Sequence, residues 1–90
     1  LGAVFQDVPE QTRRQLNIGY GIQVSSVNKG LIKDNGIQKG FIILRVNNRQ
    51  ITSVSDIEEI YKEASNSTDP VLFISGVYPS AYKGIIGKFN

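Results

Sequence analysis

The side chains that most often carry enzyme chemistry are missing from this sequence, which has no His and no Cys among its 90 residues. Without them, a Ser–His or Cys–His nucleophile pair cannot form within the chain, and a zinc site of thiolates or imidazoles is excluded. The nearest acidic pair is Glu58 and Glu59. Adjacent helical residues point about 100° apart, so these carboxylates are badly placed to share a substrate. We expect no catalytic residue, no metal site and no cofactor.

Charge and hydropathy bear on the possible partners. The net charge is +2, and the basic residues are scattered, with only Arg13 and Arg14 adjacent. A surface that follows nucleic-acid phosphates usually concentrates its positive charge, so we expect no nucleic-acid partner. No apolar run approaches the roughly 20 residues that cross a bilayer, so we expect no membrane span in this segment.

Ninety residues with 40% hydrophobic content suit one globular domain. The chain begins at Leu1, already inside an apolar stretch. We therefore expect residues 1–90 to be a single domain excised from a larger protein.

Two helices are predicted. The first covers about 10–16 and ends at Asn17, a residue that tolerates a left-handed stop. The second begins with Ser53 or Ser55 as its cap, and from Ser55 the residue Glu58 stands at the capping-box position. Apolar residues then recur at helical spacing: Ile57, Ile60, Tyr61 and Ala64.

Alternation and turn residues predict the strands. Ile22 and Val24 alternate with polar residues, and the run over 41–46 is typical of a buried strand. Asn47 and Asn48 suit a two-residue hairpin turn because both tolerate positive φ. The remaining segments are an apolar start over 1–5, one helical turn over 31–35, a return strand over 50–52, and strands over 71–78 and 81–89. This order predicts an α+β fold, mainly β: a small, partly open antiparallel sandwich or barrel capped by two helices.

The spacing of glycines and apolar residues resembles that of a PDZ domain, a peptide-binding module. The matching positions are Gly21, Val24, Val27, Gly36, Ile37, Gly40, Ile43, Val46, Asn47, Asp56 and Ile57. A helix after the first strand and two strands after the main helix resemble the strand order of PDZ domains in bacterial HtrA/DegP-type serine proteases. The sequence departs from that pattern at Phe41, where an Asp is usual, and at Ala3, where a larger apolar residue is common.

The resemblance implies a binding site rather than a catalytic one. Leu1, Gly2, Ala3 and Val4 stand where such domains place the loop that receives a ligand's terminal carboxylate. The edge formed by Ala3, Val4 and Phe5 would then pair with the ligand by strand addition. The groove side of the main helix would be formed by Asp56, Ile57, Ile60, Glu63 and Ala64.

Structural alternatives stand beside these assignments. The segment from Leu1 to Ala3 could be a frayed end. Ile57 fits the core as well as a pocket, and Asp56 and Glu63 fit a solvated helix face.

By the same resemblance, the partners would be C-terminal or unfolded polypeptide segments, the protease domain and other PDZ domains of the same host. The location would be the bacterial cell envelope or periplasm, with proteolysis in a separate domain. The alternative is a PDZ module that binds no peptide and packs oligomers or neighbouring domains together.

Overall fold

The computed structural model describes residues 2–34, 36–68 and 72–79. Its elements are β1 (Ala3–Asp7), α1 (Glu10–Leu16), β2 (Ile22–Val27), α2 (Leu31–Asp34), β3 (Ile42–Val46), β4 (Arg49–Gln50), α3 (Val54–Ser65) and β5 (Ile74–Val77). This is the predicted order of strands and helices, and the strand expected over 81–89 lies outside the described residues.

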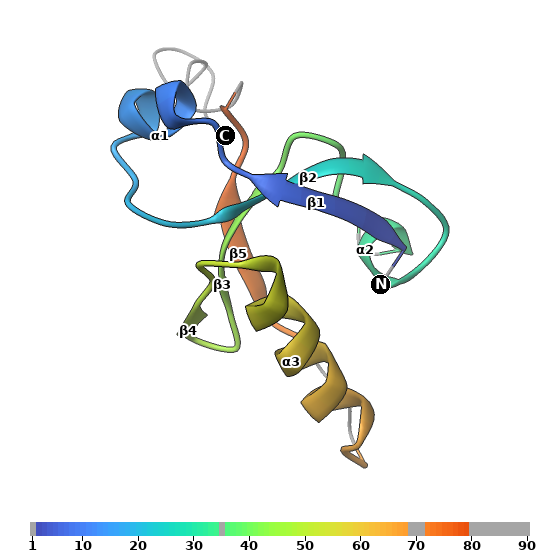
Figure 1. Ribbon diagram of the computed structural model, residues 1–90. Coiled ribbons are helices and arrows are strands. Elements are labelled where there is room, and N and C mark those ends of the chain that lie inside the picture. The colour runs from blue at the N-terminus through green and yellow to red at the C-terminus, as the bar shows by residue number, and fades with distance from the viewer. Residues whose placement is uncertain (1, 35, 69–71, 80–90) are drawn as a thin grey trace.

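The sheet is built around β3, and every strand pair in it is antiparallel. β5 pairs with β3 from Ile42 to Val46, while β2 and β4 share the opposite edge of β3. β1 lies outside β2, so the path runs β1-β2-β3-β4 with β5 on the other side of β3 (Figure 1). The predicted α+β fold with a partly open antiparallel sheet is confirmed.

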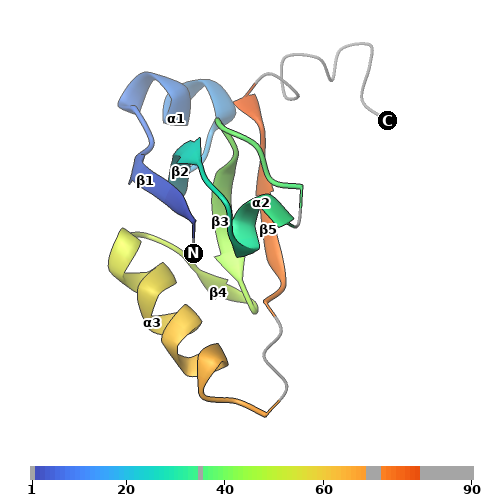
Figure 2. The same cartoon turned by 90° about the vertical axis from the view of Figure 1, so that its right-hand side faces the viewer.

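The core divides into two clusters of buried apolar side chains. The larger one joins β2, β3 and α3: Ile22, Val24, Ile43, Val46, Ile51, Ile57 and Ile60. The smaller one places α1 against the sheet through Val8, Leu16 and Ile42. The two clusters therefore hold one helix at each end of the strands, with α1 above and α3 below in both views (Figures 1 and 2).

Local sequence determines where the helices begin and end. α1 follows Pro9 and stops at Asn17, whose φ of 57° is left-handed, as predicted. α3 is preceded by a capping box in which Ser53 and Asp56 bond each other's main chain. The alternative box of Ser55 and Glu58 is wrong, because the chain turns into the helix two residues earlier.

The hairpin between β3 and β4 is also as predicted. Asn47 and Asn48 have φ values of 52° and 70°. The Asn47 side chain also links the hairpin to β5, because its Oδ1 accepts a hydrogen bond of 2.8 Å from the Phe73 amide just before β5. The Phe73 carbonyl in turn accepts from the Asn47 amide at 2.8 Å. This reciprocal pair fastens the hairpin to the start of β5.

None of the described helices has the length and hydropathy of a membrane span.

Candidate functional site

β1 is an edge strand within the described part of the sheet, with β2 along one side only (Figure 2). The Gly2 carbonyl accepts a 2.6 Å hydrogen bond from the Asn28 amide, and the Val4 carbonyl accepts one of 3.1 Å from Ser25 Oγ. Main-chain groups in an antiparallel strand point to alternate sides. The Gly2 carbonyl and the main-chain groups of Val4 therefore face β2, and the main-chain groups of Ala3 and Phe5 face the free edge.

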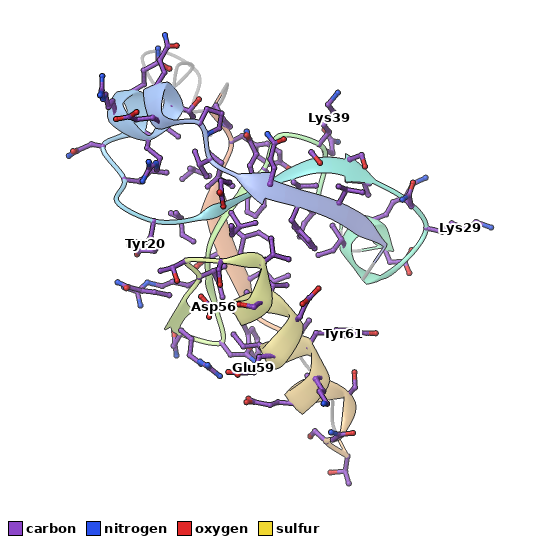
Figure 3. The ribbon with its side chains drawn as sticks, in the orientation of Figure 1. Tyr20, Lys29, Lys39, Asp56, Glu59 and Tyr61 are labelled. Carbon is purple, nitrogen blue, oxygen red and sulfur yellow. The ribbon has the colours of Figure 1, made fainter. Side chains whose placement is uncertain are left out.

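Gly2 gives the start of β1 its shape. Its φ is +78°, and a Cβ built there would stand 2.9 Å from the Gly30 Cα. Only glycine combines this conformation with such a close approach to the Lys29–Gly30 backbone. The Lys29 side chain itself extends outward from the fold (Figure 3). Leu1, the first residue expected in this loop, lies outside the described residues.

The side chains of β1 divide between the two faces of the strand. Ala3 and Phe5 are partly buried and pack on the larger core cluster, which also contains Ile57 and Ile60 of α3. Val4 is 52% exposed. β1 and α3 therefore share a core, and α3 lies below β1 in both views (Figures 1 and 2).

The residues expected on the groove side of α3 do not share one side of the helix. The apolar ones face the core, and the acidic ones face β4 and the loop before α3. Ile57 and Ile60 are 5% and 3% exposed and belong to the core, which leaves little surface for a ligand. Ala64 follows Ile60 by one turn and is half-buried. Ile57 thus takes the core alternative, and Ile60 shares it.

The two acidic residues in that set are Glu63, which faces β4, and Asp56, which faces the loop before α3. Glu63 Oε1 lies 3.4 Å from Arg49 Nη1 of β4, and Glu59 Oε1 lies 2.9 Å from Arg49 Nη2. The hydrogen bond that Arg49 donates to Glu59 raises the pKa of Arg49, and the nearby carboxylates raise it further. Asp56 Oδ2 accepts hydrogen bonds from the amide and hydroxyl of Thr52 and from the Ser53 amide, and these lower the pKa of Asp56. Asp56 therefore stabilises the helix start.

A third side of α3 remains, which the sequence reasoning missed. It carries Val54, Glu58 and Tyr61 at the i, i+4 and i+7 spacing of one helical face, and Val54 also packs partly against the larger core cluster. Tyr61 and Glu59 project from opposite sides of the helix, and Tyr61 is 39% exposed (Figure 3). Ile57 and Ile60 face the core, and the residues that contact Arg49 lie on the far side of the helix. Helical geometry alone could therefore have indicated this remaining face.

These described residues offer main-chain hydrogen-bonding groups beside apolar side chains. They include no group of three or more His, Cys, Asp or Glu that could hold a metal ion. The arrangement suits recognition of a polypeptide backbone by an added strand.

Comparison with known proteins agrees with this architecture. A family described as "PDZ-like domain" matches residues 1–67. A curated relative, the "Probable periplasmic serine endoprotease DegP-like" of Marinomonas sp. (strain MWYL1), is 31% identical over 80 residues, which cover 88% of this chain and 17% of that protein. The chain thus spans less than a fifth of that relative's length. No solved structure matches. The chain belongs to the PDZ-like domain family and is a PDZ domain of the HtrA/DegP type.

Proposed function

We propose that this domain captures the C-terminal or extended apolar end of another polypeptide by adding it as a strand to β1. The observation that carries the proposal is the free edge of β1, where the main-chain groups of Ala3 and Phe5 have no strand partner among the described residues. Such an edge is a template for pairing with another chain.

The direction of the ligand follows from where its carboxylate would sit. Amides of the tight turn at Gly2 and Ala3 would replace the water that solvates a terminal carboxylate. Gly2 precedes β1, so the ligand's last residue lies beside Ala3 and its chain runs antiparallel to the strand. Residues further from the ligand's end would then lie beside Phe5 and Asp7.

Side-chain contacts would come from both walls of this site. The ligand's apolar end would rest near Ala3 and Phe5 on the β1 side. Across from them, Glu58 and Tyr61 of α3 contact neither the core nor Arg49, and Val54 on the same face packs partly against the larger core cluster. Burying a Val- or Leu-sized side chain contributes roughly 1.5–3 kcal/mol. Micromolar affinity requires about −8 kcal/mol, so main-chain and carboxylate contacts must supply the rest.

The host is inferred from the DegP-like relative. In this proposal the domain recognises or regulates substrates for an HtrA/DegP-like serine protease of the bacterial envelope, and hydrolysis takes place in a separate protease domain. Its partners are unfolded or C-terminal segments, together with the protease and PDZ domains of the same host.

The test is a titration with an apolar peptide whose C-terminus is either free or amidated. Calorimetry should show micromolar binding of the free form and at least about tenfold weaker binding of the amide, because amidation removes the charge that the loop receives. Tyr61→Ala should weaken binding. Glu63→Ala, on the Arg49 side of the same helix, should not. Equal affinity for both peptides would refute recognition of the carboxylate.

Phe73 favours a second candidate function, packing without peptide capture. Its ring is 73% exposed, and it lies next to β5, on the opposite side of β3 from β2 and the β1 edge. Exposed apolar surface of this kind can hold neighbouring domains or subunits together. Failure of both peptides to bind, with self-association in sedimentation that Phe73→Ser abolishes, would favour this function.

A further inference from the structure

The last residue of β1 carries a negative charge that the fold does not use. Asp7 is exposed, and its carboxylate has no ion-pair or hydrogen-bond partner among the described residues. The nearby acid Glu10 is instead paired, with Oε2 2.7 Å from Arg14 Nη2. Asp7 is not needed to start α1 either, because that helix follows Pro9 without a side-chain cap. The charge of Asp7 is therefore available to a partner from outside the chain.

The alternation of β1 places Asp7 on the edge that the ligand would occupy. Ala3, Phe5 and Asp7 follow each other at steps of two residues, so their side chains share one face of the strand and their main-chain groups share the free edge. Asp7 still belongs to the sheet, opposite Ile22 of β2, and β1 ends there before the chain enters α1. Asp7 is therefore the last position at which β1 can pair with an added strand.

The register of the proposed ligand determines which of its residues meets Asp7. A chain antiparallel to β1, with its last residue beside Ala3, has its third-last residue beside Phe5 and its fifth-last beside Asp7. Directly opposite residues of antiparallel strands have Cβ atoms about 4.5–5.5 Å apart, and opposite charges at such positions attract while like charges repel. The ammonium of a Lys or the guanidinium of an Arg at the fifth-last position can therefore reach the Asp7 carboxylate.

The other charges near Asp7 leave an excess of negative charge there. Arg13 and Thr52 line the same cavity of about 270 Å³ as Asp7. Arg13 is half-buried on α1 and forms no salt bridge with Asp7 among the described residues. The Thr52 hydroxyl donates to Asp56 Oδ2 at 2.9 Å, so a second carboxylate lies behind Thr52. Two carboxylates thus stand against one guanidinium beside the fifth-last residue.

We propose that Asp7 makes this domain select a cationic side chain, Lys or Arg, at the fifth-last position of the bound peptide. The inference rests on the proposed function, since β1 must hold the peptide for this register to apply. The ion pair forms at an exposed strand edge, where such pairs contribute little to affinity. Its role is to discriminate among peptides whose last residues are alike.

The test compares free-carboxylate peptides that carry Lys, Gln or Glu at the fifth-last residue and are otherwise identical. Fluorescence anisotropy at low salt should give the Lys peptide about twofold to fivefold higher affinity than the Gln peptide, the size expected for an exposed cross-strand ion pair, and the Glu peptide should bind most weakly. The domain's net charge of +2 favours the Glu peptide at long range, so this order reports the local pair.

Two further conditions should remove the preference for Lys. Salt at about 1 M shortens the screening length to about 3 Å, which weakens an exposed pair. Moving the Lys to the fourth-last residue turns its side chain to the opposite face of the added strand, away from Asp7.

Protein variants assign the preference to Asp7. In Asp7→Asn, which keeps the shape of the side chain, the Lys and Gln peptides should bind equally. In Asp7→Lys the order should reverse, so that the Glu peptide binds best, and a merely structural role for Asp7 would not produce this reversal. Glu10→Gln removes the same charge from α1, outside the strand, and should keep the preference. Circular dichroism checks that each variant is folded, and the Gln peptide is the reference within each variant.

The outcomes separate this inference from the function beneath it. If free-carboxylate peptides bind and amidation weakens them, but Lys, Gln and Glu give equal affinities, the selection is refuted and the proposed function stands. A Lys preference that survives Asp7→Asn, that Asp7→Lys leaves unreversed or that Glu10→Gln removes equally also refutes it, as does one that persists at high salt or at the fourth-last position. If no peptide binds, or amidation has no effect, the proposed function fails and the selection fails with it.

Discussion

Gly2 holds the start of β1 in a left-handed conformation and against the Lys29–Gly30 backbone. We expect Gly2→Ala to lower the free energy of unfolding by more than Gly36→Ala. Gly36 has a similar φ of +81° but open space around it. Left-handed backbone costs an L-residue roughly 1–2 kcal/mol at either site, and only Gly2→Ala adds a clash. Urea denaturation compares the two, and equal losses would show that the close approach carries no energy.

The two hairpin asparagines should respond differently to glycine. Asn48→Gly should leave stability unchanged or raise it slightly, because Gly favours positive φ. Asn47→Gly should lower stability by about 1 kcal/mol, since it deletes the acceptor for the Phe73 amide. Thermal unfolding measured by circular dichroism checks both. Similar shifts for the two variants would mean that the Asn47 side chain contributes nothing.

At the residue scale, sequence reasoning succeeded where one residue determines its own backbone. Asn17, Asn47 and Asn48 all have the positive φ expected of them. It could not reach contacts that depend on a residue distant in the chain. Nothing local to Glu63 indicates that Arg49 of β4 lies 3.4 Å from it.

α3 depends on a single carboxylate at its start. Asp56 has a lowered pKa in the folded domain, so its stabilisation is complete above the unfolded value of 3.8 and is lost as the pH falls through the folded value. Asp56→Asn should therefore be less stable than the parent at neutral pH, with the difference shrinking in acid. Urea midpoints measured at neutral pH and in strong acid test this. Glu58→Gln should follow the parent's pH trend, and a constant Asp56→Asn deficit would contradict the assignment.

At the element scale, the sequence predicted the elements better than the directions they face. α1 has the predicted bounds, and β3 starts one residue after the predicted Phe41. The apolar stripe of α3 was recognised, yet Ile60 was assigned to the ligand side. A helix has several faces, and the strand that packs beside it decides which of them is core. That information lies in the tertiary contacts, where Ala3 and Phe5 join Ile57 and Ile60.

The whole domain offers a direct measure of strand addition. Peptide binding should slow hydrogen exchange at the amides of Ala3 and Phe5, which face the free edge. The Val4 amide, directed towards β2, should change little. NMR exchange with and without a free-carboxylate peptide records this alternation. Uniform protection of all three amides would indicate general stabilisation in place of an added strand.

Topology was predictable because the order of elements and the spacing of glycines are written along the chain. The pairing of the strands was less predictable, because β3 pairs with three different strands. Its partners in β2 lie 19 to 21 residues earlier in the chain, and its partners in β5 lie 28 to 35 residues later. Short apolar strands such as Ile74–Val77 do not reveal which edge they join, because many pairings bury a similar side-chain set.

The late position of β5 has a consequence for how the protein is made. β3 is threaded between a strand synthesised before it and another that follows α3. A nascent chain that has emerged only as far as α3 leaves one side of β3 bare, with Ile42 and Ile43 lacking the neighbour that covers them. The ribosome must release Val77 before the sheet can close, so the unfinished chain passes through an interval in which chaperones would find an open strand.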